Sequence, residues 1–199
     1  MNDWSCAPVL EGRHVRLEPL QAAHVEDLAK AAADGELWNR WYTNVPKPEA
    51  MAAYVEAALP SSANGTMLPF VVRDARGDIV GTTRYYDNDP ATPRLQIGYT
   101  WYAARVHRTG LNTEAKLLLL EHAFETLGCI AVGLETSWFN HASRAAIACL
   151  GAKQDGVIRN HLRHADGSIL DTVTFSIIDV EWPAVKRHLK FKLEEASLG

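Results

Sequence analysis

The stretch between residues 94 and 138 constrains the fold more than any other part of the sequence. Two apolar segments, RLQIGYTWYA (94–103) and CIAVGLETSW (129–138), have the composition of β-strands. Between them lies NTEAKLLLLEHAFETLG (112–128), whose apolar residues recur at helical spacing. A strand, a helix and a second strand in this order form a parallel crossover, which is almost always right-handed. The sequence therefore predicts an α/β fold built on a sheet with a parallel strand pair.

The flanking sequence extends this unit to a mixed α+β sheet of about seven strands with helices on both faces. Further strands are predicted at 14–20, 68–75, 78–87, 156–163 and 169–179, and further helices at 21–34, 47–60, 140–151 and 181–195. Two pairs of these strands are joined by short turns and should be antiparallel. No repeat, low-complexity segment or linker interrupts the sequence, which predicts a single domain over residues 1–199.

The charge balance argues against whole classes of partner. The formal net charge is −4, with 22% charged and 47% hydrophobic residues. A protein that binds nucleic acid or an anionic membrane surface would need a basic excess, so neither partner is expected. We find no signal peptide or membrane span in the sequence. The cysteines Cys6, Cys129 and Cys149 are odd in number and widely spaced, which favours reduced thiols in the cytoplasm over disulfides or a metal site.

The loop RVHRTGLNT (105–113) places a glycine and three basic side chains directly before the apolar helix. The first turn of a helix has backbone N–H groups without partners and a partial positive charge, so such a loop can bind an anionic ligand. The pattern is neither a Walker loop nor a GxGxxG loop. The alternative is a solvated basic loop whose helix is capped by Asn112 or Thr113.

On a longer stretch, the chain resembles the GNAT acetyltransferases, in particular their RimJ/RimL branch. The resemblance runs from LEGRHVRLEPL through IGYTWYAARVHRTGLNTEAKLLLLEHAFETLG and NHASRAAIACLGA to DTVTFSIIDVEWPAVKRHL. It implies the GNAT fold, in which a bulged fourth strand splays from the fifth and leaves a cleft. It also implies a loop of pattern Gln/Arg-x-x-Gly-x-Gly/Ala around the diphosphate of acetyl-CoA. Arg105 and Gly110 fit that pattern, whereas Arg108 replaces its first glycine.

The resemblance also implies how this chain would hold coenzyme A. The implied cofactor-binding residues are Trp101, Tyr102, Ala103, Arg105, Val106, His107, Arg108, Thr109, Gly110, Leu111, Asn112, Thr113, Asn140 and Ser143. The amides of residues 106–111 would line the diphosphate. Main-chain groups of residues 101–103 would pair with the pantetheine arm, to which Asn140 would also hydrogen-bond.

Acetyl transfer to an amine needs a donor for the developing oxyanion and a proton for the departing thiolate. A main-chain N–H at the bulge, near Trp101 or Tyr102, is the candidate oxyanion donor. Ser143 is the candidate group near the sulfur, acting directly or through water. Its alternative role is that of a hydroxyl that caps or begins a helix, and both roles can hold together.

The transfer also needs a neutral amine, and hence a base. Many family members carry a Glu directly before the Ile/Leu-Gly-Tyr sequence. This chain has Gln96 there, which cannot accept a proton at neutral pH. Glu135 and Asp87 are the remaining candidates, and Glu135 is the one that we predict to be catalytic. For each of them, the alternative is a solvated surface carboxylate.

Aromatic residues mark the expected acceptor side. Trp38 and Tyr42 lie in an irregular loop where this fold shapes the acceptor pocket, and Tyr85 and Trp101 lie on predicted strands. These four are the candidate substrate residues, although a core role is the alternative for the strand residues.

The resemblance implies an acetyl-CoA-dependent N-acetyltransferase, which moves an acetyl group to a primary amine by direct attack in a ternary complex. The acceptor would be a protein N-terminus or a small amine. The departures at Gln96 and Arg108 keep open a second hypothesis, a regulatory module that binds acyl-CoA without turning it over. Dimers are common in the family, and the sequence leaves open whether this chain forms a homodimer.

Overall fold

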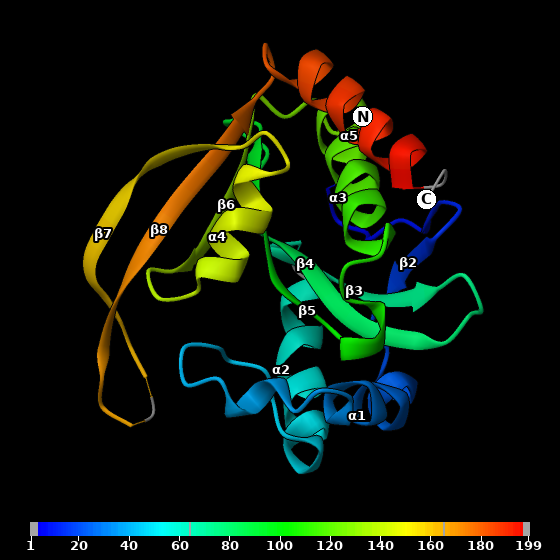
Figure 1. Cartoon of the computed structure of the whole chain (residues 1–199), viewed down its shortest axis with the longest axis vertical. Coiled ribbons are helices and arrows are strands. Elements are labelled where there is room, and N and C mark those ends of the chain that lie inside the picture. Colours follow the sequence, from blue (N-terminus) through cyan, green and yellow to red (C-terminus); the bar gives the residue numbers. More distant parts are fainter. Residues whose placement is uncertain (1–3, 64, 165, 197–199) are drawn as a thin grey trace.

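The computed structural model describes residues 4–63, 65–164 and 166–196, which are arranged around a mixed sheet (Figure 1). Within these residues the sheet has eight strands in the order β1-β2-β3-β4-β5-β6-β8-β7. The strands are β1 Leu10–Glu11, β2 Val15–Pro19, β3 Met67–Asp74, β4 Ile79–Asp89, β5 Arg94–Tyr102, β6 Ala131–Ser137, β7 Lys153–Arg163 and β8 Ile169–Ile178. Strands β5 and β6 are parallel, as the crossover predicts, and the other neighbours are antiparallel. All seven predicted strands are present, and the short β1 adds another at the edge.

Helices cover both faces of this sheet. They are α1 Val25–Ala33, α2 Met51–Ala63, α3 Leu111–Glu121, α4 His141–Ala148 and α5 Trp182–Ala196, with short 3₁₀ turns at η1 Ala22–His24, η2 Leu37–Asn39, η3 Pro48–Ala50 and η4 Ala104–Val106. Helices α1 and α2 lie on one side, whereas α3 and α5 pack together on the other (Figure 1). None of the helices in the described ranges is long and apolar enough to cross a bilayer.

Two predicted helices differ in detail from the prediction, although Gly128 ends the long helix as expected. The segment predicted as one helix from residue 47 to 60 is a 3₁₀ turn followed by α2, and Pro60 lies inside α2 instead of ending it. A helical proline removes one hydrogen bond to the residue four positions back, and near a helix end this single loss does not stop the helix. The long central helix becomes a π-helical turn, His122–Thr126, before Gly128 ends it with a φ of 73°.

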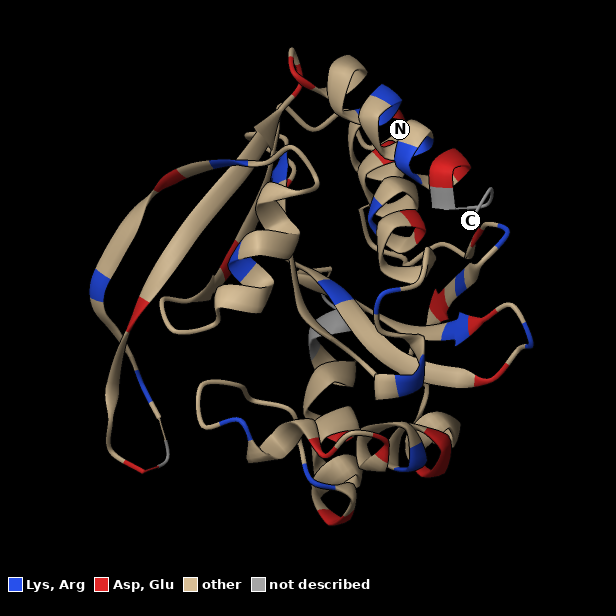
Figure 2. Ribbon diagram, in the orientation of Figure 1, with Lys and Arg blue, Asp and Glu red and all other residues tan. Residues whose placement is uncertain are grey.

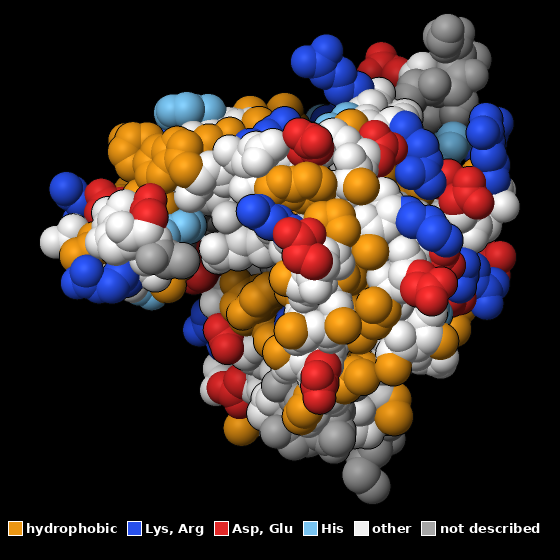
Figure 3. All heavy atoms as spheres, turned by 90° about the horizontal axis from the view of Figure 1, so that it is seen from below, with side chains coloured by type: hydrophobic (Ala, Val, Ile, Leu, Met, Phe, Trp, Pro, Cys, Tyr) orange, Lys and Arg blue, Asp and Glu red, His pale blue; other side chains and the backbone are white. Residues whose placement is uncertain are grey.

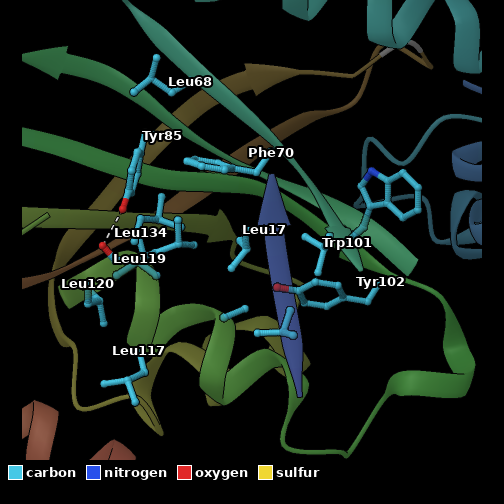
Figure 4. Close-up of a cluster of buried hydrophobic side chains, with 14 of the residues drawn as sticks. Leu17, Leu68, Phe70, Tyr85, Trp101, Tyr102, Leu117, Leu119, Leu120 and Leu134 are labelled. Carbon is cyan, nitrogen blue, oxygen red and sulfur yellow. Dashed lines mark hydrogen bonds between the residues drawn. The ribbon is translucent and has the colours of Figure 1, made fainter. Parts of the chain in front are cut away.

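The hydrophobic core fills both faces of the sheet, under α1 and α2 on one side and under α3 on the other, and Figure 4 shows part of it. Leu17, Phe70 and Leu119 are fully buried, and burial of each such side chain contributes roughly 1.5–3 kcal/mol. Tyr85 joins the sheet to the helix. Its ring stands perpendicular to that of Phe70 at a centroid distance of 5.4 Å, and its hydroxyl donates to the Leu119 carbonyl at 2.6 Å. This packing fixes α3, and the loop before it, relative to the sheet.

The start of α3 is also tied to the turn between β1 and β2. The carboxylate of Glu114 is buried and accepts hydrogen bonds from the backbone N–H groups of Arg13, at 2.9 Å, and His14. A Cβ atom on Gly12 would lie only 2.4 Å from that carboxylate carbon. The turn can therefore approach the helix because residue 12 has no side chain.

Candidate active site

The parallel strands β5 and β6 separate halfway along β5. They pair from Arg94 with Ala131 to Ile97 with Leu134, and beyond this point β5 pairs only with β4 and β6 only with β8. The cause lies in β5, where the register against β4 shifts between Gly98 and Trp101. The bulged residue Tyr99 has a left-handed φ of 52°, which turns the strand away from its neighbour. The edge of β5 that follows Ile97 thus faces β6 without pairing to it.

The loop after β5 contains a second left-handed residue. Arg108, which replaces the first glycine of the family pattern, has a φ of 61°. This conformation costs a residue with a side chain about 1–2 kcal/mol. The position therefore keeps the backbone conformation that glycine favours, although the residue type has changed. A left-handed residue next to a helix start is a backbone arrangement that can form an anion-binding nest.

Several amides of the loop are already used inside the protein. The N–H groups of Val106 and His107 donate to the carbonyls of Ala103 and Ala104, and that of Leu111 donates to the Thr109 hydroxyl at 3.3 Å. Helix α3 begins after Gly110, which provides no side-chain cap, so neither Asn112 nor Thr113 is the capping residue. The amides of residues 108–110, 112 and 113 are the groups that remain for a ligand, since that of Glu114 donates to the Gly110 carbonyl.

Positive charge gathers beside this loop in a hollow of about 400 Å³. Its lining residues are His14, Arg108, Thr109, Gly110, Thr113, Lys192 and Leu193. Lys192 comes from α5 and was not predicted as part of the site, although the basic sequence KRHLKFK marks that helix. Arg105 is held apart from the hollow, since its Nη1 forms an ion pair with Asp34 at 3.2 Å. Elsewhere basic and acidic residues are interspersed along the ribbon (Figure 2).

At the end of β5, more main-chain groups are hydrogen-bonded within the protein than the sequence suggested. The Tyr102 carbonyl lies 2.9 Å from Nε2 of His107, and the Ala103 N–H donates to the Val80 carbonyl at 2.7 Å. Trp101 and Tyr102 point to opposite sides of β5 and are both buried (Figure 4). Open main-chain groups are therefore found closer to the bulge than to residue 103.

Across the gap, α4 begins at the residues expected near the pantetheine and the sulfur. Asn140 is the N-cap of α4, and its Oδ1 accepts the N–H of Ser143 at 3.1 Å. The cap uses only the amide oxygen, which leaves the Asn140 side-chain NH₂ to donate to a ligand. The Ser143 side chain takes no part in this cap, and its hydroxyl is half-buried in the first turn.

On the α1–α2 side of the sheet, a polar cluster lies where β4, β5 and β6 meet. The Tyr86 hydroxyl donates to Oε1 of Gln96 at 3.1 Å, and the Gln96 amide nitrogen lies 3.3 Å from Asp87 and 3.5 Å from Glu135. Burial, with the nearby carboxylates of Glu135 and Asp87, raises the pKa of Tyr86, which therefore stays a proton donor. Gln96, the residue in place of the family Glu, thus connects both alternative bases.

Beneath the bulge, on the α3 side, lies a cation that the sequence did not reveal. Lys116 is 5% exposed, and its Nζ donates to the Thr100 hydroxyl at 2.9 Å, which in turn bonds the Thr83 hydroxyl at 2.8 Å. Burial lowers the pKa of Lys116 to about 7. In the sequence, Lys116 is one lysine in an apolar helix. Only the packing of α3 beneath the bulge distinguishes it from other lysines.

The predicted aromatic residues separate into two groups. Trp38 and Tyr42 are half-buried in the loop between α1 and α2, and their neighbour Trp41 reaches Phe139, before α4, at a centroid distance of 5.0 Å. The loop therefore contacts the segment that carries Asn140. Tyr85 lies in the core with its hydroxyl bonded to α3 and is not placed to contact a substrate, and Trp101 is buried on β5. Seen from the α1–α2 end, a recess separates the β7–β8 hairpin from the body of the molecule (Figure 3).

The metal-binding residue types form no cluster of three or more within the described ranges.

The sequence and the fold both match known proteins. The family model described as the acetyltransferase (GNAT) domain matches residues 14–153. No curated protein sequence matches the chain.

Among solved structures, a GCN5-related N-acetyltransferase from Brucella melitensis is similar with a TM-score of 0.85 and 30% identity, covering 94% of this chain and 85% of that chain. Mycobacterium smegmatis RimJ, in complex with CoA-disulfide, has a TM-score of 0.77 and 20% identity over 93% of both chains. The microcin C7 self-immunity acetyltransferase MccE, in complex with acetyl-CoA and AMP, has a TM-score of 0.75 and 17% identity over 88% of this chain and 99% of that chain. At 20% and 17% identity, the likeness to the last two structures is evidence for the fold alone.

Proposed function

Because this chain belongs to the GNAT acetyltransferase family, whose members use acetyl-CoA, we propose that it is an N-acetyltransferase that acetylates a primary amine. The observation that carries the proposal is the separation of β5 from β6 at the Tyr99 bulge, directly before a loop with a left-handed Arg108. An extended ligand with an anionic end fits this combination, because one part offers unpaired strand edge and the other offers converging N–H groups.

We assign the residues of the loop and of α4 to acetyl-CoA. The amides of residues 108–110, 112 and 113 would hold the diphosphate, with charge from Arg108 and Lys192. The open edge of β5 and the amide NH₂ of Asn140 would hold the pantetheine arm. When bound, acetyl-CoA supplies the activated acetyl thioester.

The remaining residues would act on the acceptor and the leaving group. Glu135, oriented by Gln96, would take the proton of the incoming ammonium so that the neutral amine attacks directly in a ternary complex. A main-chain N–H near Trp101 would stabilise the oxyanion, and one such donor contributes roughly 3–4 kcal/mol. The Ser143 hydroxyl would give a proton to the departing sulfur, directly or through water.

The proposal also covers the domain organisation, the family branch, the cellular compartment and the partners. We place the chain as a single domain in the RimJ/RimL branch, acting in the cytoplasm, with a peptide N-terminus or a small amine as acceptor. The cysteines Cys6, Cys129 and Cys149 are free thiols, two of them exposed, which supports a reducing compartment. Neither nucleic acid nor a membrane is part of the proposal, and a homodimer is compatible with it.

One observation favours a second function, a module that binds acyl-CoA without turnover: Gln96 stands where many relatives have a carboxylate. Calorimetric titration with acetyl-CoA, followed by a thiol-release assay with amines and peptides, separates the two. We expect saturable binding and acceptor-dependent thiol release. Binding without release for any acceptor would favour the module, and no binding would contradict both functions.

Asn140→Ala tests the placement of acetyl-CoA. The loss of one hydrogen-bonding side chain should weaken acetyl-CoA binding by about tenfold, and loss of the helix cap should lower the free energy of unfolding by about 1 kcal/mol. Asn39→Ala, at an exposed asparagine between α1 and α2, is the matched control and should leave the affinity unchanged. Equal affinity in both variants would mean that the arm of the carrier lies elsewhere.

A further inference from the structure

Arg84, on β4, is a buried cation without an anion beside it. The residue is only 5% exposed. Its Nη1 contacts the Met67 sulfur at 3.2 Å, and its Nε is buried without a hydrogen-bond partner. In the part of the chain that the structure describes, no Asp or Glu forms an ion pair with it. A guanidinium has five N–H donors, and a thioether is a weak acceptor.

Two tyrosine rings hold this guanidinium in place. Its Cζ lies 4.6 Å from the ring centroid of Tyr54, on α2, and 4.5 Å from that of Tyr99, on the bulge. Each such contact contributes about 0.5–2 kcal/mol, whereas taking a charged group out of water costs several kcal/mol. A methionine would fill the same space at lower cost. The buried charge with an unpartnered Nε therefore points to a negatively charged ligand.

Arg84 lies next to the proposed site of acetyl transfer. It pairs with Gly98, directly before the bulge, and projects to the α1–α2 side because its neighbour Tyr85 projects to α3. The ring of Tyr99 contacts both the Arg84 guanidinium and the ring of Tyr86, the latter at 5.3 Å. Tyr99 is 50% exposed, so it forms the boundary between Arg84 and solvent.

The other end of the same face is acidic. Gln96, next to Tyr86, connects the carboxylates of Asp87 and Glu135. Arg84 on β4 and Glu135 on β6 belong to strands two positions apart, and Glu135 follows the last residue pair of β5 with β6, so their backbones lie at least roughly 10 Å apart. A small ligand with an amine toward the carboxylates and a negative charge toward Arg84 can meet both side chains.

We propose that the acceptor is a small primary amine that carries a carboxylate, the amino-acid class, and that Arg84 binds this carboxylate. The assignment rests on the proposed N-acetyltransferase function and names its substrate class. Tyr54 and Tyr99 hold the guanidinium ready, and the ammonium of the acceptor lies toward Glu135. The carboxylate provides the hydrogen-bond acceptor that Arg84 lacks within the described residues.

The test compares matched acceptors in the thiol-release assay. Glycine, L-alanine and 4-aminobutyrate are each assayed against their amides, which keep the amine and remove the negative charge. We expect at least one acid to exceed its amide by more than about tenfold in kcat/KM, because the amide leaves Arg84 unpaired. This comparison uses the unaltered protein, so it does not depend on the folding of a variant.

Variants of Arg84 connect that preference to the residue. Arg84→Met should lower kcat/KM for the preferred acid by roughly 100-fold and leave that for its amide nearly unchanged. Arg84→Lys should restore part of the preference, and acetyl-CoA affinity, measured by calorimetry, should stay the same in both. Arg16→Met, at a half-exposed arginine on β2, is the control and should keep the preference.

The failures are distinguishable. Equal kcat/KM for acids and amides, turnover limited to peptides, or a preference that survives in Arg84→Met would overturn this assignment while leaving the acetyltransferase function intact. Absence of thiol release with every amine, despite acetyl-CoA binding, would overturn the proposed function and this assignment with it.

Discussion

The two proposed sides of the candidate site, one for acetyl-CoA and one for the acceptor, offer different kinds of chemical groups. The carrier side, formed by the loop 104–113 and the starts of α3 and α4, offers mainly backbone N–H groups and helix ends. The acceptor side, formed by Tyr86, Gln96 and Glu135 with Arg84, offers side chains from three strands. Backbone groups suit a ligand that is the same for a whole family, whereas side chains can change with each acceptor. The carrier side should therefore depend on chain geometry and the acceptor side on residue chemistry.

The largest expected effect is on the carrier side. Gly110→Asp places a carboxylate beside the proposed diphosphate, and a like charge at about 4 Å costs about 4 kcal/mol near a protein surface, or roughly 1,000-fold in acetyl-CoA affinity. Gly110→Ala is the control, since its Cβ would lie 3.3 Å from the His14 ring and adds no charge. Calorimetry measures both. Similar affinities for the Asp and Ala variants would remove the diphosphate from this loop.

The next effect concerns Lys116, beneath the bulge that both sides share. Burial lowers its pKa from 10.5 to about 7, so between these values the unfolded chain holds a proton that the folded chain lacks. The free energy of unfolding should therefore rise with pH across this window. Lys116→Met should remove that rise and stabilise the protein at neutral pH on the order of 3 kcal/mol.

Urea denaturation at about pH 7 and about pH 10 measures this effect. Lys30→Met, at an exposed lysine on α1, serves as the control and should change little. A less stable Lys116→Met variant would show that the ammonium contributes more through Thr100 than its burial costs.

A smaller effect is expected for the base on the acceptor side. Glu135→Gln should lower kcat by about 100-fold without changing acetyl-CoA affinity, because the carboxylate would act only on the amine. Asp87→Asn is the matched variant, since both carboxylates contact Gln96. If Asp87→Asn alone lowers kcat, the base is Asp87. If neither does, the amine loses its proton without these side chains.

The smallest effect separates backbone from side chain on the carrier side. Arg108→Gly relieves a left-handed residue and should raise the free energy of unfolding by about 0.5–1 kcal/mol. Its acetyl-CoA affinity should fall by less than about tenfold, since only one exposed charge is lost. Arg108→Ala loses the charge and keeps the strain. Tighter binding by the Ala variant than by the Gly variant would contradict the role assigned to the backbone.

The sequence located the loop before α3 more directly than the cluster around Gln96, for a physical reason. The loop and helix start are contiguous in the chain, so that Gly110 and the apolar residues of α3 identify them in the sequence. Lys192 was missed because it reaches the same hollow from α5, about 80 residues later in the sequence and adjacent only through helix packing.

What the sequence determined by itself is the order of its elements, the parallel crossover and the position of the loop before α3, since each depends on local periodicity and turn residues. Only the tertiary structure decided that Tyr85 is a core residue, that Gln96 connects two carboxylates and that Arg84 is buried beside the bulge. Strand register and bulges set which side chains meet, and the energies that fix them come from contacts between residues far apart in the chain.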